Sequence, residues 1–351
     1  MVDLENNMQK YAGLIIRTGV NLQKDQTLVI SSPVECAPFT RLCAKAAYQA
    51  GAREVVTLWN DEQLSLLKYR HCGLDVLASY PDWCVQARMQ YLNEGAAYLS
   101  IAAEDPELFA QIEPEKMQLA AKASHTALRE FYDATMSNRN SWCVVSAPTA
   151  AWARKVFPGC ADDGEAVNKL WDAIFRTTRV YEPDPVAAWA AQQRDLRRRI
   201  QWLNEKRFHA LRYRNSLGTD FTAGLARGHI WCGGAEETQE GVPFIANMPT
   251  EEVFTTPDKD RLEGTLCSAL PLNYNGVLIE DFSLTFERGR VVSFSARKGE
   301  DTLRCLLDSD EGARSLGEVA LVPANSPIPQ LGILFYNTLY DENASCHFAL
   351  G

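Results

Sequence analysis

The stretch QTLVISSPVECAPFTRLCAKAAYQAGAREVVTLW, residues 26–59, decides the fold of the first half of the chain. It begins with an apolar run, residues 26–31, and ends with a second one, residues 54–59. Between them, residues 37–50 show the pattern of a helix that Gly51 stops. Strands of a parallel sheet are buried on both faces and are joined by helical crossovers. The stretch therefore predicts a β-α-β unit of a parallel sheet.

The same alternation continues as far as residue 206. Further strands are expected over residues 96–103 and 142–147, and helices over residues 62–70, 115–136, 165–177 and 184–206. Asp184 can cap the last of these helices, and Pro185 fits its first position. We therefore expect an α/β doubly wound domain with a parallel sheet over residues 1–206.

After residue 206 the pattern changes to short strands with frequent glycines. Strands are expected over residues 208–215, 220–225, 229–232, 277–280, 282–286 and 291–296. The second domain, residues 207–351, is therefore expected to be mostly β, which gives an α+β chain. Its candidate metal-binding segments make it the expected catalytic domain.

Composition excludes several classes of protein. Of the 351 residues 46% are hydrophobic and 23% are charged, which is ordinary for a folded globular chain. The 45 acidic residues outnumber the 35 basic ones and give a net charge of −10, which argues against nucleic acid or an anionic membrane as a partner. The N-terminal segment, residues 1–10, carries acids where a signal peptide carries bases, so a cytoplasmic location is expected.

Common catalytic motifs are missing from the sequence. There is no GxGxxG or GxxxxGK[ST] phosphate loop, no HExxH zinc motif and no GxSxG nucleophile elbow. The ten cysteines are scattered and are interpreted as reduced hydrophobic residues. The basic run Arg197–Arg198–Arg199 could contact phosphate or form a solvated helix face. His71, His125, His209 and His229 are interpreted as surface or hydrogen-bonded residues.

Three segments of the second domain hold carboxylates or histidine beside apolar residues. The first, residues 247–258, contains Glu251 and Glu252, of which only one can point into a given site if the segment is extended. The second, residues 316–327, places Glu318 at the start of the apolar run VALV. The third, residues 338–351, contains Asp341, Glu342 and His347. Two glutamates and a histidine could bind a divalent metal, although each of them alone is more often a paired or solvated group than a ligand.

These segments resemble the M29 metalloaminopeptidases, the group of aminopeptidase T and aminopeptidase S. The residues that carry the resemblance are GTDFTAGL (218–225), HIWCGG (229–234), PFIANMPTEEVFTTPD (243–258), LGEVALVPANSPI (316–328) and FYNTLYDENASCHFALG (335–351). The resemblance covers the whole chain in its layout and is tightest from residue 205 onward.

The resemblance implies that N-terminal amino acids are removed from peptides by a centre of two divalent ions, Co²⁺, Zn²⁺ or Mn²⁺, in a homodimer. It assigns the metal ligands to Glu252, in preference to Glu251, and to Glu318 and His347. A family tyrosine with a catalytic role and a His-x-Asp pair would fall beyond Gly351. The resemblance thus implies a chain truncated at its C-terminus, with a β domain incomplete there, no assigned catalytic residue and ligands for one ion.

Two other interpretations remain open at this point. The chain could be a truncated, inactive homologue that binds peptide or metal without turnover. It could also be an α/β module that binds a ligand at the carboxyl ends of its strands, although the missing phosphate loop argues against that.

Overall fold

The computed structural model describes residues 4–274 and 276–351, so the first three residues of the acidic N-terminal segment lie outside the described part. Contacts divide the chain into two compact units. Unit 1 comprises the residues up to Asp105, Lys116–Gln192 and Ala235–Thr250, and unit 2 comprises Pro106–Glu115, Gln193–Gly234 and Glu251–Gly351. This division differs from a single boundary at residue 206, because residues 193–206 belong to unit 2 and residues 235–250 to unit 1.

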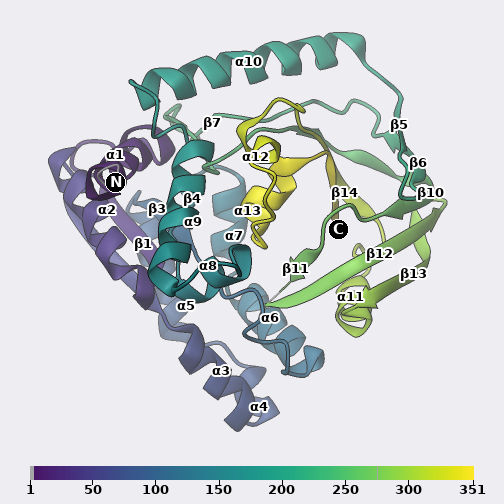
Figure 1. Cartoon of the computed structure of the whole chain (residues 1–351), viewed down its shortest axis with the longest axis horizontal. Helices are drawn as coiled ribbons and strands as arrows, with labels where there is room; N and C mark the ends of the chain where they lie inside the picture. Colours follow the sequence, from purple (N-terminus) through teal and green to yellow (C-terminus); the bar gives the residue numbers. More distant parts are fainter. Residues whose placement is uncertain (1–3, 275) are drawn as a thin grey trace. The chain divides into compact units, whose positions relative to one another are not determined.

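Unit 1 is built on a sheet of four parallel strands (Figure 1). The order is β2 (Glu54–Asn60), β1 (Thr27–Pro33), β3 (Ala97–Ala102) and β4 (Trp142–Ser146). Leu28, Val29 and Ile30 of the inner strand β1 are almost fully buried, since a strand with a neighbour on each side and helices above and below contacts no water. The parallel sheet predicted from the apolar runs is confirmed.

Helices precede, connect and follow these strands along the chain. They are α1 (Leu4–Leu14), η1 (Ile15–Gly19), η2 (Val34–Cys36), α2 (Ala37–Gln49), α3 (Glu62–His71), α4 (Leu74–Leu77), α5 (Asp82–Asn93), α6 (Pro114–Ala127), α7 (Arg129–Met136), α8 (Ala150–Val156), α9 (Asp163–Thr177) and α10 (Pro185–Lys206). The prediction of one helix over residues 115–136 is wrong, because Leu128, with ψ of 11°, separates α6 from α7.

Unit 2 contains a mainly antiparallel sheet of six strands (Figure 1). The order is β11 (Leu272–Tyr274), β12 (Val277–Glu287), β10 (Pro257–Cys267), β6 (Asp220–Leu225) and β5 (Ala210–Arg214), with β13 (Arg290–Lys298) also paired to β12. The expected β-rich C-terminal region is therefore confirmed.

Some predicted strands of this region need correction. Residues 229–232 form no strand, because a turn closes at Gly228 and only Cys232 makes an isolated bridge, to Phe254. Residues 277–280 and 282–286 belong to one strand, β12, which continues through Asp281 although that residue has φ of 49°.

The remaining elements are short. They are β7 (Glu236–Glu237), β8 (Pro243–Phe244), β9 (Val253–Thr255), α11 (Glu300–Leu307), β14 (Leu316–Leu321), α12 (Pro327–Gln330), α13 (Thr338–Asp341), η3 (Glu342–Ala344) and β15 (His347–Leu350). In unit 2, β9 and β15 flank β14 in a three-stranded antiparallel sheet. No helix in the described residues combines the length and apolar character needed to span a bilayer.

An aromatic cluster in the core of unit 2 holds this small sheet. Phe221 is fully buried and its ring lies 5.2 Å from that of Phe286 and 5.5 Å from that of Phe348. The ring of Tyr213 lies 4.8 Å from that of Phe348. Because Phe348 belongs to β15, packing in the core fixes the strand that also carries His347.

Removing the ring at the centre of this cluster should be costly. We expect Phe221→Ala to lower the free energy of unfolding by about 3–5 kcal/mol, since it leaves a cavity among large side chains. Urea denaturation followed by fluorescence measures the change. Val292→Ala, at a side chain that is 53% exposed, is the control and should change stability by less than about 0.5 kcal/mol. Equal effects of the two substitutions would show that the cluster does not hold the sheet.

Candidate metal centre

Strand register places the three predicted ligands on one face of the small sheet. His347 of β15 pairs with Ala320 of β14, and Phe254 of β9 pairs with the same residue from the other side. Glu318 precedes Ala320 by two residues, and Glu252 precedes Phe254 by two. Because side chains alternate along a strand, all three functional groups point to the face on which Ala320 lies.

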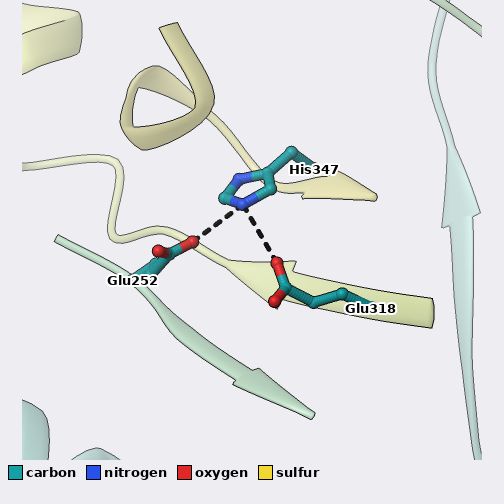
Figure 2. Close-up of side chains that lie close together, drawn as sticks. All are labelled: Glu252, Glu318 and His347. Atoms are coloured by element: carbon teal, nitrogen blue, oxygen red, sulfur yellow. Dashed lines mark ion pairs between the residues drawn. The ribbon is translucent and has the colours of Figure 1, made fainter. Parts of the chain in front are cut away.

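The three side chains point toward one another, as Figure 2 shows. His347 Nε2 lies 2.7 Å from Glu252 Oε2 and 3.5 Å from Glu318 Oε1. One potential ligand atom from each residue lies within 4.8 Å of the others. Two atoms that each bind a single ion at about 2.1 Å are at most about 4.2 Å apart. The cluster is therefore close to the size that one ion requires.

The chemistry of this donor set fits a divalent cation. Burial lowers the pKa of His347, but the adjacent carboxylates of Glu252 and Glu318 outweigh this effect and raise the pKa to about 11. Glu252 Oε2 is buried and, apart from the imidazole Nε2 of His347 at 2.7 Å, has no hydrogen-bond partner among the described residues. Two carboxylates and an imidazole that converge in this way suit a divalent cation.

A further carboxylate, Glu342, lies within electrostatic reach of this cluster. Burial is the main cause that raises its pKa, with repulsion from Glu252 next, and the pKa reaches about 8. Its neighbour Asp341 is held by backbone N–H groups, since its carboxylate accepts hydrogen bonds from Phe335 at 2.9 Å and Asn337 at 3.1 Å. These bonds fix the turn that carries Glu342.

Asn343 ties two segments of the centre together. Its side chain is completely buried, its Oδ1 accepts a hydrogen bond from Glu251 N at 2.7 Å, and its Nδ2 donates one to Leu339 O at 3.1 Å. The backbone beside Glu252 is thereby joined to the turn that precedes His347. Sequence reasoning did not identify Asn343, because no local pattern shows which distant N–H group an amide will meet.

The whole described chain matches one family of proteins. The model of the family "Thermophilic metalloprotease (M29)" matches residues 4–351. The chain belongs to the M29 metalloprotease family. Aminopeptidase 2 of Geobacillus stearothermophilus is 48% identical over 347 residues, which are 99% of this chain and 84% of that protein. Aminopeptidase AmpS of Bacillus subtilis is 43% identical over 351 residues, which are 100% and 85% of the two chains.

The fold agrees with that of a solved member. Wild-type AmpT from Thermus thermophilus superposes with a TM-score of 0.92 at 42% identity and covers 99% of this chain and 86% of its own. The alignments extend over most of each relative. They do not show the predicted truncation, and they do not favour the inactive homologue or the α/β ligand-binding module.

Loss of the Asn343 amide should loosen the centre. Asn343→Ala leaves the buried N–H of Glu251 without its acceptor, so we expect the free energy of unfolding to fall by about 1–3 kcal/mol. Thermal and urea denaturation measure the loss. Asn325→Ala, at an exposed asparagine of the same unit, is the matched control. If both variants are as stable as the parent, the bridge has no structural importance.

Proposed function

We propose that this chain is a metal-dependent aminopeptidase that removes N-terminal amino acids from peptides. The observation that carries the proposal is the convergence of Glu252, Glu318 and His347 on one sheet face, in a chain of the M29 family. The names of the relatives describe aminopeptidases, which supports peptides as substrates and hydrolysis as the reaction. The homodimer and the cytoplasmic location expected from the sequence are part of the same proposal.

Glu252, Glu318 and His347 would hold one divalent ion, and the resemblance implies a second. Bound divalent ions polarise the carbonyl group of the scissile bond and lower the pKa of water. Without a metal, the two carboxylates keep the imidazole of His347 protonated. To bind the cation, His347 must lose this proton, so that its Nε2 lone pair becomes the ligand.

Glu342 is the residue best placed to move protons in this reaction. Hydrolysis adds the oxygen of water to the carbonyl carbon and breaks the C–N bond. In its ionised form, the carboxylate of Glu342 would take the proton from the water and deliver it to the leaving nitrogen. Its position beside Glu252, His347 and Glu318 supports this role, and partial exclusion of water suits a proton carrier.

Metal binding should depend on the three converging residues. We expect Glu252→Ala, Glu318→Ala and His347→Ala each to weaken Co²⁺, Zn²⁺ or Mn²⁺ binding and to lower kcat/KM for an aminoacyl reporter by more than about 100-fold, or about 3 kcal/mol. Calorimetry and metal analysis of the purified chain provide the affinity and the ratio of ions to protein. Chelator should abolish turnover, and added metal should restore it.

The control is His71→Ala, at an exposed histidine of unit 1, which should leave metal binding and turnover unchanged. Hydrolysis that is indifferent to chelator would reject the metalloenzyme. A ratio of one ion per chain in the active protein would reject only the second ion and would leave the rest of the proposal standing.

Substitution of Glu342 should separate proton transfer from metal binding. Glu342→Gln keeps the shape of the side chain but removes the proton acceptor, so we expect kcat to fall about 10²–10⁴-fold while metal affinity changes less than tenfold. Metal affinity that falls in parallel with kcat would instead assign Glu342 as a ligand. An unchanged kcat would exclude it from the reaction.

A further inference from the structure

A hollow of about 460 Å³ in unit 2 is not used by the proposed metal chemistry. One flank of α10 supplies Asp195, Arg198, Arg199 and Trp202 to its lining. The strand segments supply Val253 and Leu321. Val253 and Leu321 are register partners in β9 and β14. Since Val253 directly follows Glu252, its side chain points to the opposite face of the small sheet.

The floor of this hollow is apolar. Trp202 remains 51% exposed, which is unusual for an indole on a folded chain, and Leu203, Val322 and Pro323 also line the hollow. An apolar side chain placed there would cover the indole and remove water from Leu321. The hollow therefore suits an aliphatic or aromatic group.

The rim is strongly basic. Leu196, Ile200 and Leu203 anchor α10 to the core of unit 2 at helical spacing, so other residues of the helix face outward. A second hollow of about 400 Å³ is lined by Arg194, Arg197, Arg198 and Gln201, and it shares Arg198 with the first.

Most of these arginines are not neutralised. Asp195 pairs with Arg198, but among the described residues no carboxylate forms an ion pair with Arg194, Arg197 or Arg199. Four guanidinium groups thus face one carboxylate, in a chain whose net charge is −10. We call this surface, formed by the two hollows, the arginine groove.

We propose that the arginine groove binds the distal part of a peptide, where a carboxylate lies next to an apolar side chain. The apolar group would rest on Trp202, Val253 and Leu321, and Arg198 and Arg199 would bind the carboxylate through paired N–H donors. The inference rests on the proposed function in taking peptides as substrates. It narrows the substrate class to peptides that are acidic beyond their N-terminal residues.

The groove would therefore favour peptides long enough to reach both faces of the small sheet. A peptide of about six residues spans on the order of 20 Å when extended.

Binding of a blocked peptide tests the groove without requiring hydrolysis. The probe is an N-acetylated, fluorescein-labelled octapeptide whose C-terminal half alternates leucine and glutamate, titrated with metal-free protein. We expect saturable binding that weakens at least tenfold in Arg198→Gln/Arg199→Gln and at least tenfold when glutamine replaces glutamate in the peptide. Trp202→Ala should also weaken it, and added salt should reduce the affinity of the parent protein.

Arg53→Gln/Arg227→Gln is the matched control, because it removes the same charge from exposed arginines outside the groove. Binding that is equal in the two double variants, or equal for the acidic and neutral peptides, would overturn the proposal. The probe cannot be cleaved, so its binding does not depend on hydrolysis. If the protein binds the probe but hydrolyses no free peptide, the proposal for the groove stands and the proposed aminopeptidase function is rejected.

Discussion

The register of the sheet β15-β14-β9 is the constraint on which the candidate centre depends. Ala320 pairs with His347 on one side and with Phe254 on the other. Glu318 lies two positions before Ala320 and Glu252 two before Phe254, so their side chains share the face of His347. A slip of one residue in β15 would turn His347 away and present Phe348 to the carboxylates. That slip would also remove Phe348 from Tyr213 and Phe221 and expose its ring to water. Hydrophobic packing on one face thus selects the register that assembles the candidate metal-binding face.

Electrostatics opposes this arrangement, and local hydrogen bonds hold it in place. Glu252, Glu318 and Glu342 bring like charges into a partly buried site, and the raised pKa of Glu342 records the unfavourable burial and repulsion. A turn with little apolar surface could relieve the repulsion by moving away. Asp341 prevents this by accepting two backbone hydrogen bonds, and Asn343 fastens the same turn to Glu251. Carboxylates that are held close together despite their mutual repulsion are typical of a functional site, such as one that binds a cation.

Much of this fold could be predicted from the sequence because burial leaves a local pattern. The runs at β1 and β2 are continuous since both faces of a parallel strand are covered. Strand β10 was not predicted, because its sequence PDKDRLEGTLC mixes charged side chains with few buried ones such as Leu262. The interruption at Leu128 was missed since no glycine or proline marks it.

The candidate site was predicted only in part, for a similar reason. The resemblance indicated Glu252, Glu318 and His347, but their convergence requires β14 to pair with both β9 and β15, which are far apart in the sequence. Composition cannot reveal such pairing. The hydrogen bond between Asn343 and Glu251 also joins distant positions, which are 92 apart in the sequence.

The two faces of the small sheet lie beside groups of opposite charge, because one face carries the carboxylates and the other borders the arginines of α10, and this matches the polarity of a peptide. The face of Glu252 is acidic, whereas the face of Val253 borders the arginine groove. A free peptide carries an ammonium group at one end and a carboxylate at the other. Its N-terminus is attracted to the carboxylates, and its distal acidic groups are attracted to the guanidinium groups. The same charge separation would therefore both attract a peptide to the chain and orient it with its N-terminal bond at the proposed metal centre.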